Sequence, residues 1–144
     1  MSLYTIDASV FVNAFNPYED GHAQSNRFMR WIYDEKMPVI VPTLLLPELA
    51  AAIGRGRQDV DLARSFVERV HGLAYFTFVA LTDDLALLSA DVAARYRLRG
   101  SDAIYVAVAQ AYGATLVTLD REQRERADVV APTRSPTEIV ANLA

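Results

Sequence analysis

Short apolar runs and longer stretches of helical period alternate along this chain. The short runs are rich in β-branched and aromatic side chains, a composition typical of strands in the interior of a sheet. We therefore expect five strands, at residues 3–6, 39–41, 75–81, 115–118 and 128–131.

The stretches between these runs place their apolar residues three or four positions apart, which predicts helices. The predicted helices cover residues 7–15, 22–35, 43–53, 59–70, 82–97 and 101–112, and a short one begins at Ser135-Pro136. In the second helix, Phe28, Trp31 and Ile32 fall on one side and are expected in the core. The segment Gly54-Arg55-Gly56 is expected to end the third helix.

Strands that alternate with helices of about ten residues indicate βαβ units and a parallel sheet. The predicted fold class is α/β: one domain over residues 1–144, with a mostly parallel central sheet of four to five strands and helices on both faces. In such sheets ligands bind at the carboxyl ends of the strands, where the strand order reverses.

Composition narrows the range of chemistry. The 144 residues are 52% hydrophobic and contain no cysteine, which excludes disulfides, thiolate-bound metals and a cysteine nucleophile. The longest uncharged run, residues 103–119, is too short and too polar to span a bilayer. The first residues lack the features of an export signal, so a cytoplasmic location is expected.

Four acidic residues stand in apolar surroundings: Asp7, Glu48, Asp102 and Asp120. Three of them stand where a helix can begin, so helix capping alone accounts for Asp7, Asp102 and Asp120. Glu48 lies farther inside its helix and lacks this explanation. Because parallel strands end at one edge of the sheet, all four side chains can converge on one cleft.

A cluster of carboxylates needs raised pKa values or a bound cation, because like charges repel. Oxygen ligands select a hard ion, so the prediction is one or two Mg²⁺ or Mn²⁺ ions. Such a centre hydrolyses phosphate esters by activating water. The formal net charge of -4 speaks against a nucleic-acid partner, but it would be zero without these four carboxylates.

Four segments carry these acids and resemble the PIN-domain ribonucleases, particularly the VapC-type toxins of toxin-antitoxin modules. The segments are Asp7-Ala8-Ser9, Pro47-Glu48-Leu49, Gly100-Ser101-Asp102-Ala103 and Gly113-Ala114-Thr115-Leu116-Val117-Thr118-Leu119-Asp120. The resemblance implies a Mg²⁺ or Mn²⁺ centre held by the four acids, cleavage of single-stranded RNA, a homodimer and a cognate antitoxin protein.

By the same resemblance, Ser9 and Thr118 would be hydroxyls that orient a carboxylate or contact the phosphate. Local capping by the serine and the strand propensity of threonine explain them equally well. Some relatives carry a further acid shortly after the Thr-x-Asp, where Gln123 and Arg124 stand here, so we predict no fifth ligand.

Thirteen of the fourteen basic residues are arginine. The candidates for RNA contact, by their place in the chain, are Arg55, Arg57, Arg97, Arg99 and Arg121. A PIN-like module that binds RNA or a partner without cutting is the main alternative. A phosphatase or receiver that forms an aspartyl phosphate is less favoured, because the sole lysine, Lys36, sits at a charged helix end.

Overall fold

Five parallel strands form the central sheet, in the order β3-β2-β1-β4-β5, in the computed structural model, which describes residues 2–143. The strands are β1 (Tyr4–Ile6), β2 (Val39–Pro42), β3 (Phe76–Val79), β4 (Thr115–Val117) and β5 (Thr133–Arg134). The α/β class and the parallel sheet are confirmed. The sheet is buried between helices, which explains why its strands are near-continuous apolar runs.

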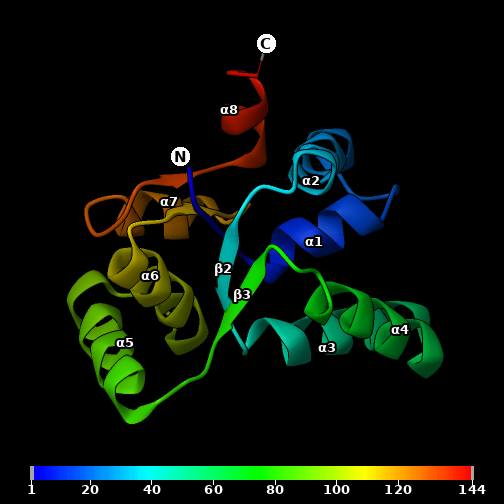
Figure 1. Ribbon diagram of the computed structural model, residues 1–144. Helices are drawn as coiled ribbons and strands as arrows, with labels where there is room; N and C mark the ends of the chain where they lie inside the picture. Colours follow the sequence, from blue (N-terminus) through cyan, green and yellow to red (C-terminus); the bar gives the residue numbers. More distant parts are fainter. Residues whose placement is uncertain (1, 144) are drawn as a thin grey trace.

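Helices cover both faces of this sheet, as Figure 1 shows: α1 to α4 lie on one side, and α5 and α6 on the other. Their bounds are α1 (Ala8–Phe15), α2 (His22–Glu35), α3 (Leu45–Arg57), α4 (Val60–His71), α5 (Asp83–Tyr96), α6 (Gly100–Tyr112), α7 (Arg121–Ala127) and α8 (Pro136–Val140). Within residues 2–143, none of the helices has the length and apolar character needed to cross a membrane.

The core confirms the pattern that the sequence predicts for α2. Phe28 and Ile32 are fully buried, and the ring of Tyr4 on β1 meets the rings of Phe28 and Trp31 edge-on, with centroids 6.0 and 5.7 Å apart. Edge-on pairs are a favourable aromatic geometry. This cluster fixes α2 against the central strand of the sheet.

The strand predicted at residues 128–131 is wrong. These residues form turns after α7, and the fifth strand lies slightly later, at β5. The Asp128 carboxylate accepts a hydrogen bond from the Thr133 backbone N–H at 3.0 Å, which closes the turn. The apolar pair Val129-Val130 resembles a strand in composition, but Val129 is 77% exposed and lies in the turn rather than in the sheet.

The predicted end of α3 is also wrong, because the helix continues through Gly54 and Gly56 to Arg57. A Cβ at either glycine would meet open space, so neither glycine is required by packing. The helix ends at Gln58, whose φ of 51° is left-handed. The helical cost of glycine, roughly 1 kcal/mol per residue, is thus tolerated in this exposed last turn.

Residues 121–126 form a run of mostly charged side chains, which the sequence pattern predicts to be solvated and does not predict to be a helix. In the structure they form most of α7. Only Gln123 and Ala127 are buried on this helix, too few for a recognisable period. The capping signal before it, Asp120, was the available indication of a helix.

The strand order reverses beside β1. The chain passes from β1 to β2 and β3 on one side and returns to β4 on the other. Ile6 pairs with Val117, so Asp7 and Thr118 both follow directly on the last paired residues of two adjacent strands. This is the place where an open parallel sheet binds ligands.

Candidate functional site

Asp7 occupies the end of β1 and caps α1. Its carboxylate accepts the backbone N–H of Ser9 at 3.4 Å, and the side chain is buried, with 8% exposure of the residue. Capping therefore explains why an acid is tolerated here, as the sequence allowed. It does not account for the other hydrogen bonds that converge on the same carboxylate.

Two hydroxyls donate to Asp7. The Thr118 hydroxyl lies 2.8 Å from Oδ2 of Asp7, and the Ser9 hydroxyl lies 3.3 Å from the same oxygen. The Ser9 hydroxyl also accepts the backbone N–H of Leu119 at 3.3 Å. Ser9 and Thr118 thus connect the end of β1 to the end of β4 and fix the orientation of the Asp7 carboxylate.

Asp120 follows β4 and caps α7. Its Oδ1 accepts the backbone N–H of Gln123 at 3.1 Å, and its backbone N–H donates to the Thr118 hydroxyl at 3.2 Å. Its other oxygen faces Arg99 rather than a neutral donor.

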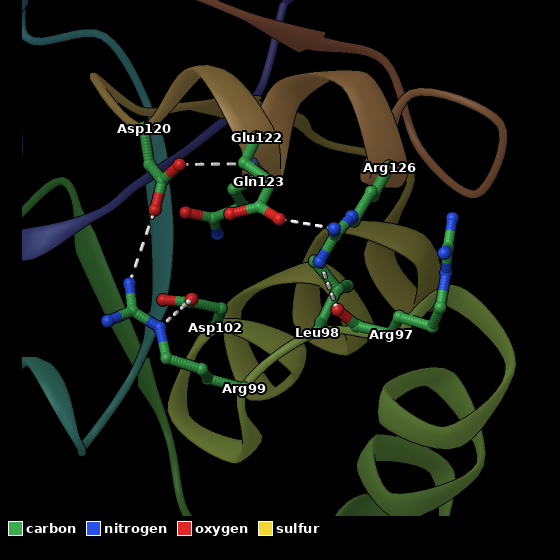
Figure 2. Close-up of a pocket in the computed structure, with 8 residues that line it drawn as sticks. All are labelled: Arg97, Leu98, Arg99, Asp102, Asp120, Glu122, Gln123 and Arg126. Carbon is green, nitrogen blue, oxygen red and sulfur yellow. Dashed lines mark hydrogen bonds and ion pairs between the residues drawn. The ribbon is translucent and has the colours of Figure 1, made fainter.

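Arg99 joins Asp120 to Asp102, as Figure 2 shows. Its Nε lies 3.0 Å from Oδ2 of Asp102, and a terminal nitrogen lies 3.2 Å from Oδ2 of Asp120. Asp102 stands in the first turn of α6, so the helix N-terminus also favours its negative charge. One guanidinium therefore spans two carboxylates that come from different elements.

Glu48 lies in the first turn of α3, not farther inside the helix as the sequence suggested, so the helix N-terminus also favours its negative charge. Its side chain points at α6. The Tyr105 hydroxyl donates to Oε1 of Glu48 at 2.6 Å, and Tyr105 is buried. Sequence reasoning missed Tyr105, although its place three residues after Asp102 on α6 puts both side chains on the same helix face. A tyrosine one turn after a candidate acid was the signal.

The electrostatics show which acids lack compensation. Burial raises the pKa of Asp7 above its usual range, and the charge of Asp102 raises it further, while the hydrogen bonds from Thr118 and Ser9 act in the opposite direction. Burial also raises the pKa of Glu48, as do the charges of Asp7 and Asp102, while the hydrogen bond from Tyr105 and the charge of Arg99 act in the opposite direction. The negative charges of different elements therefore interact across the site.

All four acids line one cavity of about 440 Å³, together with Ser9, Glu19, Arg55 and Arg99. A second cavity of about 310 Å³ adjoins it and shares Arg99, Asp102 and Asp120; Arg97 and Gln123 also line it (Figure 2). The structure thus brings together the four acids that the sequence singled out.

The five candidate arginines have different places. Arg55 and Arg99 line the larger cavity and Arg97 the smaller one. Arg57 lies over the ring of Phe15, 5.4 Å from its centroid, and Arg121 pairs with Glu125 on the exposed side of α7 at 3.1 Å. Neither Arg57 nor Arg121 is among the residues that line these two cavities.

The four acids line one cavity, but their carboxylates are too far apart to form a complete set of metal ligands. Within residues 2–143, no three histidine, aspartate or glutamate side chains have the spacing to hold a metal ion. The donor set nevertheless fits a hard cation, because it consists of carboxylate oxygens. The pKa values of two of the acids, Asp7 and Glu48, are raised, and a nearby positive charge would lower them.

Gln123 is a further residue that sequence reasoning did not assign to the site. It is 1% exposed, and its Oε1 lies 3.1 Å from the Thr118 hydroxyl, so it contacts the group that orients Asp7. Its Nε2 is buried without a hydrogen-bond partner in the described part of the chain. Its position three residues into a capped helix was visible in the sequence, but its contact with Thr118 was not.

Comparison with known families decides the classification, because the sequence profile of the PIN domain matches residues 4–129. The chain belongs to the PIN-domain family. The matched range contains all four acids. A search of curated protein sequences found no match.

Solved structures share this PIN fold. PAE2754 from Pyrobaculum aerophilum is 23% identical, with a TM-score of 0.68 over 99% of this chain and 95% of that one. VapC20 from Mycobacterium tuberculosis, described as a sarcin-ricin loop cleaving toxin, is 17% identical, with a TM-score of 0.69 over 85% and 93%. VapBC2 from Rickettsia felis, bound to a DNA fragment from its promoter, contains a chain that is 14% identical, with a TM-score of 0.67 over 92% and 98%.

The position of Lys36 bears on the aspartyl-phosphate alternative. Lys36 ends α2 just before β2 begins, whereas Asp7 follows the end of β1. Because the two strands are parallel, these residues lie at opposite edges of the sheet. Lys36 is therefore not placed to contact a phosphoryl group on Asp7.

Proposed function

We propose that this PIN-domain protein is a metal-dependent endoribonuclease that hydrolyses phosphodiester bonds of single-stranded RNA. The observation that carries the proposal is the meeting of Asp7, Glu48, Asp102 and Asp120 at one cavity, beside the strand-order reversal. Membership of the PIN family and the likeness to an RNA-cleaving toxin support the same chemistry.

In this proposal the four acids hold one or two Mg²⁺ or Mn²⁺ ions. When bound, the cation supplies an acidic water and neutralises charge on the phosphate. Thr118 and Ser9 keep the Asp7 carboxylate turned toward the cavity, and Tyr105 does the same for Glu48. These contacts hold the acids in place before substrate arrives, which lowers the cost of reaching the reactive geometry.

Substrate binding is assigned to the arginines that line the two cavities. Arg55 and Arg99 border the acids, and Arg97 borders the adjoining cavity. Guanidinium groups match phosphate geometry with two parallel hydrogen bonds. A single strand passing over both cavities would place its backbone on these arginines.

The test is cleavage of a labelled single-stranded RNA with Mn²⁺ or Mg²⁺, with excess EDTA, and with Asp7→Asn. We expect EDTA to abolish cleavage and Asp7→Asn to reduce it by roughly 10²-fold or more, with an unchanged circular dichroism spectrum, since asparagine caps helices as well as aspartate does. The control is Asp91→Asn, which removes an exposed carboxylate on α5 paired with Arg95. Full activity of Asp7→Asn would end the proposal.

The proposal includes a biological role as the toxin of a toxin-antitoxin pair, acting in the cytoplasm as a homodimer. The likeness to chains from toxin-antitoxin complexes supports it. We expect a short neighbouring gene that encodes a DNA-binding protein. Its product should copurify with this chain and restore the growth of cells in which expression of this chain alone stops growth. Light scattering of the purified chain at twice the 16.0 kDa monomer mass would support the dimer.

Two observations favour a non-catalytic RNA-binding module instead. Arg99 already neutralises part of the charge of Asp102 and Asp120, and no three acids in the described residues have metal-binding spacing. Retained binding of single-stranded RNA, with neither cleavage nor any thermal shift in millimolar Mn²⁺, would favour that function.

A further inference from the structure

Arg99 contacts carboxylates of the candidate site that a cation would also bind. It precedes α6, and its guanidinium contacts one oxygen of Asp102 and one of Asp120. Figure 2 shows both contacts as dashed lines from the Arg99 guanidinium to the two carboxylates. These are two of the four carboxylates to which the proposed function assigns the metal.

The oxygen that Arg99 takes on Asp120 is the one that the fold leaves available. Oδ1 of Asp120 caps α7 by accepting the Gln123 N–H, and Oδ2 accepts from Arg99. Oδ2 is therefore the oxygen of Asp120 that a cation can bind without competing with the helix cap. Because two positive groups at one oxygen repel each other, the cation and Arg99 compete for it.

The ion pairs of Arg99 with Asp102 and Asp120 can break without disturbing the core. The Arg99 side chain is 76% exposed, whereas the side chains of Asp102 and Asp120 are 15% and 33% exposed. Water competes for the exposed guanidinium, which reduces what the two ion pairs contribute to stability. Asp7 is the opposite case, since its donors are buried hydroxyls. Moving Arg99 away breaks no buried packing.

We propose that Arg99 is a built-in competitor of the cation: it bridges Asp102 and Asp120 in the metal-free protein, leaves them when the cation binds, and then contacts a substrate phosphate. This inference rests on the proposed function. Its first part concerns cation affinity alone, which can be measured without RNA. Its second part concerns substrate, because the released guanidinium remains at the rim of the cavity shared with Arg55.

The decisive experiment measures Mn²⁺ binding by calorimetry for the full chain and for three variants. Arg99→Ala should bind Mn²⁺ roughly five- to tenfold more tightly, because the cation no longer has to break the two ion pairs of the exposed guanidinium. Arg99→Lys keeps the charge but cannot span both carboxylates, so a smaller gain is expected. Arg55→Ala is the matched control, because Arg55 lines the same cavity, whereas the ion pairs with Asp102 and Asp120 are made by Arg99.

The control separates direct competition from long-range charge. If Arg55→Ala tightens Mn²⁺ binding as much as Arg99→Ala does, the gain comes from net charge and the inference is wrong. An unchanged or weaker affinity of Arg99→Ala also overturns it. If neither the wild type nor Arg99→Ala binds Mn²⁺, this inference and the proposed metal site fail together, which the other outcomes do not imply.

RNA cleavage at saturating Mn²⁺ tests the second part. Arg99→Ala should then show a kcat/KM roughly tenfold lower than the wild type despite its tighter metal binding, because a phosphate contact is lost. Opposite changes in metal affinity and in cleavage are the expected signature. Cleavage equal to that of the wild type would remove Arg99 from the substrate contacts.

Discussion

The ends of β1 and β4 offer the same residue in the same role, yet in different surroundings. Asp7 and Asp120 each follow a strand and each cap the next helix. Asp7 is buried and receives neutral hydroxyl donors, whereas Asp120 is partly exposed and receives the Arg99 guanidinium. Neutral donors orient a carboxylate without cancelling its charge, so the uncompensated charge of the site is concentrated at Asp7.

This difference divides the site into a fixed half and an adjustable half. On the fixed half, the β1–β4 register and buried hydrogen bonds hold Asp7 in one orientation. On the adjustable half, the exposed Arg99 can leave Asp102 and Asp120 at little cost. A cation would thus find one carboxylate already oriented and would displace a side chain to reach two others.

The largest expected effect among these tests of the comparison follows from Thr118→Val on the fixed half. The hydroxyl donates to Asp7 and accepts the Asp120 N–H, so its loss removes the shortest hydrogen bond to the buried carboxylate, leaves it only the donors of Ser9, and takes the acceptor from a backbone N–H. We expect a stability loss of about 1–3 kcal/mol by urea unfolding and roughly 10- to 100-fold weaker Mn²⁺ binding by calorimetry.

Thr118→Ser keeps the hydroxyl and should recover most of the Mn²⁺ affinity. Thr115→Val, on the same strand, is the control for a threonine-to-valine change in β4. A Thr118→Val protein with the affinity of the wild type would show that Asp7 is not held by this hydroxyl, and the two halves would no longer differ as argued.

Tyr105→Phe should have a smaller effect, because Glu48 is only half-buried and water can replace the lost donor. The variant removes a 2.6 Å hydrogen bond to the carboxylate while keeping the ring in the core. We expect Mn²⁺ affinity to fall by up to about tenfold and stability by about 1 kcal/mol. Tyr112→Phe, on the exposed end of α6, is the matched control.

If Tyr105→Phe weakens Mn²⁺ binding as much as Thr118→Val does, Glu48 belongs to the fixed half of the site. If the affinity is unchanged, Glu48 either does not bind the cation or is oriented by it. The first result would extend the fixed half from the strand ends to α3 and α6.

The sequence predicted the sheet class and the meeting of the four acids because both depend on local signals. Apolar runs mark the strands, and an acid directly after a run must lie at the carboxyl edge of a parallel sheet. The sequence failed where residue type alone is ambiguous. The apolar run at 128–131 is folded into a turn by the hydrogen bond from the Thr133 N–H to Asp128, and the exposed last turn of α3 continues past Gly54 against the low helix propensity of glycine.

The same distinction holds within the site. Asp7 and Asp120 were recognisable singly, but the contacts of Tyr105 with Glu48 and of Gln123 with Thr118 join residues whose proximity only the fold determines. The place of Arg99 in the chain makes it a candidate for RNA contact, and this role stays a prediction. Its bridge between Asp102 and Asp120 spans two elements and could not be read from spacing alone.

The smallest expected effect is a pH dependence of stability that distinguishes the uncompensated acids. The pKa values of Asp7 and Glu48 are raised in the folded protein, chiefly by burial, so between their ordinary and raised values the folded state binds more protons than the unfolded state does. Their contribution to stability is therefore favourable at low pH and is lost as pH rises through the folded-state values.

In metal-free protein, Asp7→Asn should have a Tm above that of the wild type at pH 7, and the gap should narrow as the pH falls toward the ordinary carboxyl range. Adding Mn²⁺ at pH 7 should reverse the order, because a cation stabilises only the protein that binds it. A Tm gap independent of pH, measured by calorimetry in EDTA, would mean that the charge of Asp7 is already compensated, and the contrast with Asp120 would disappear.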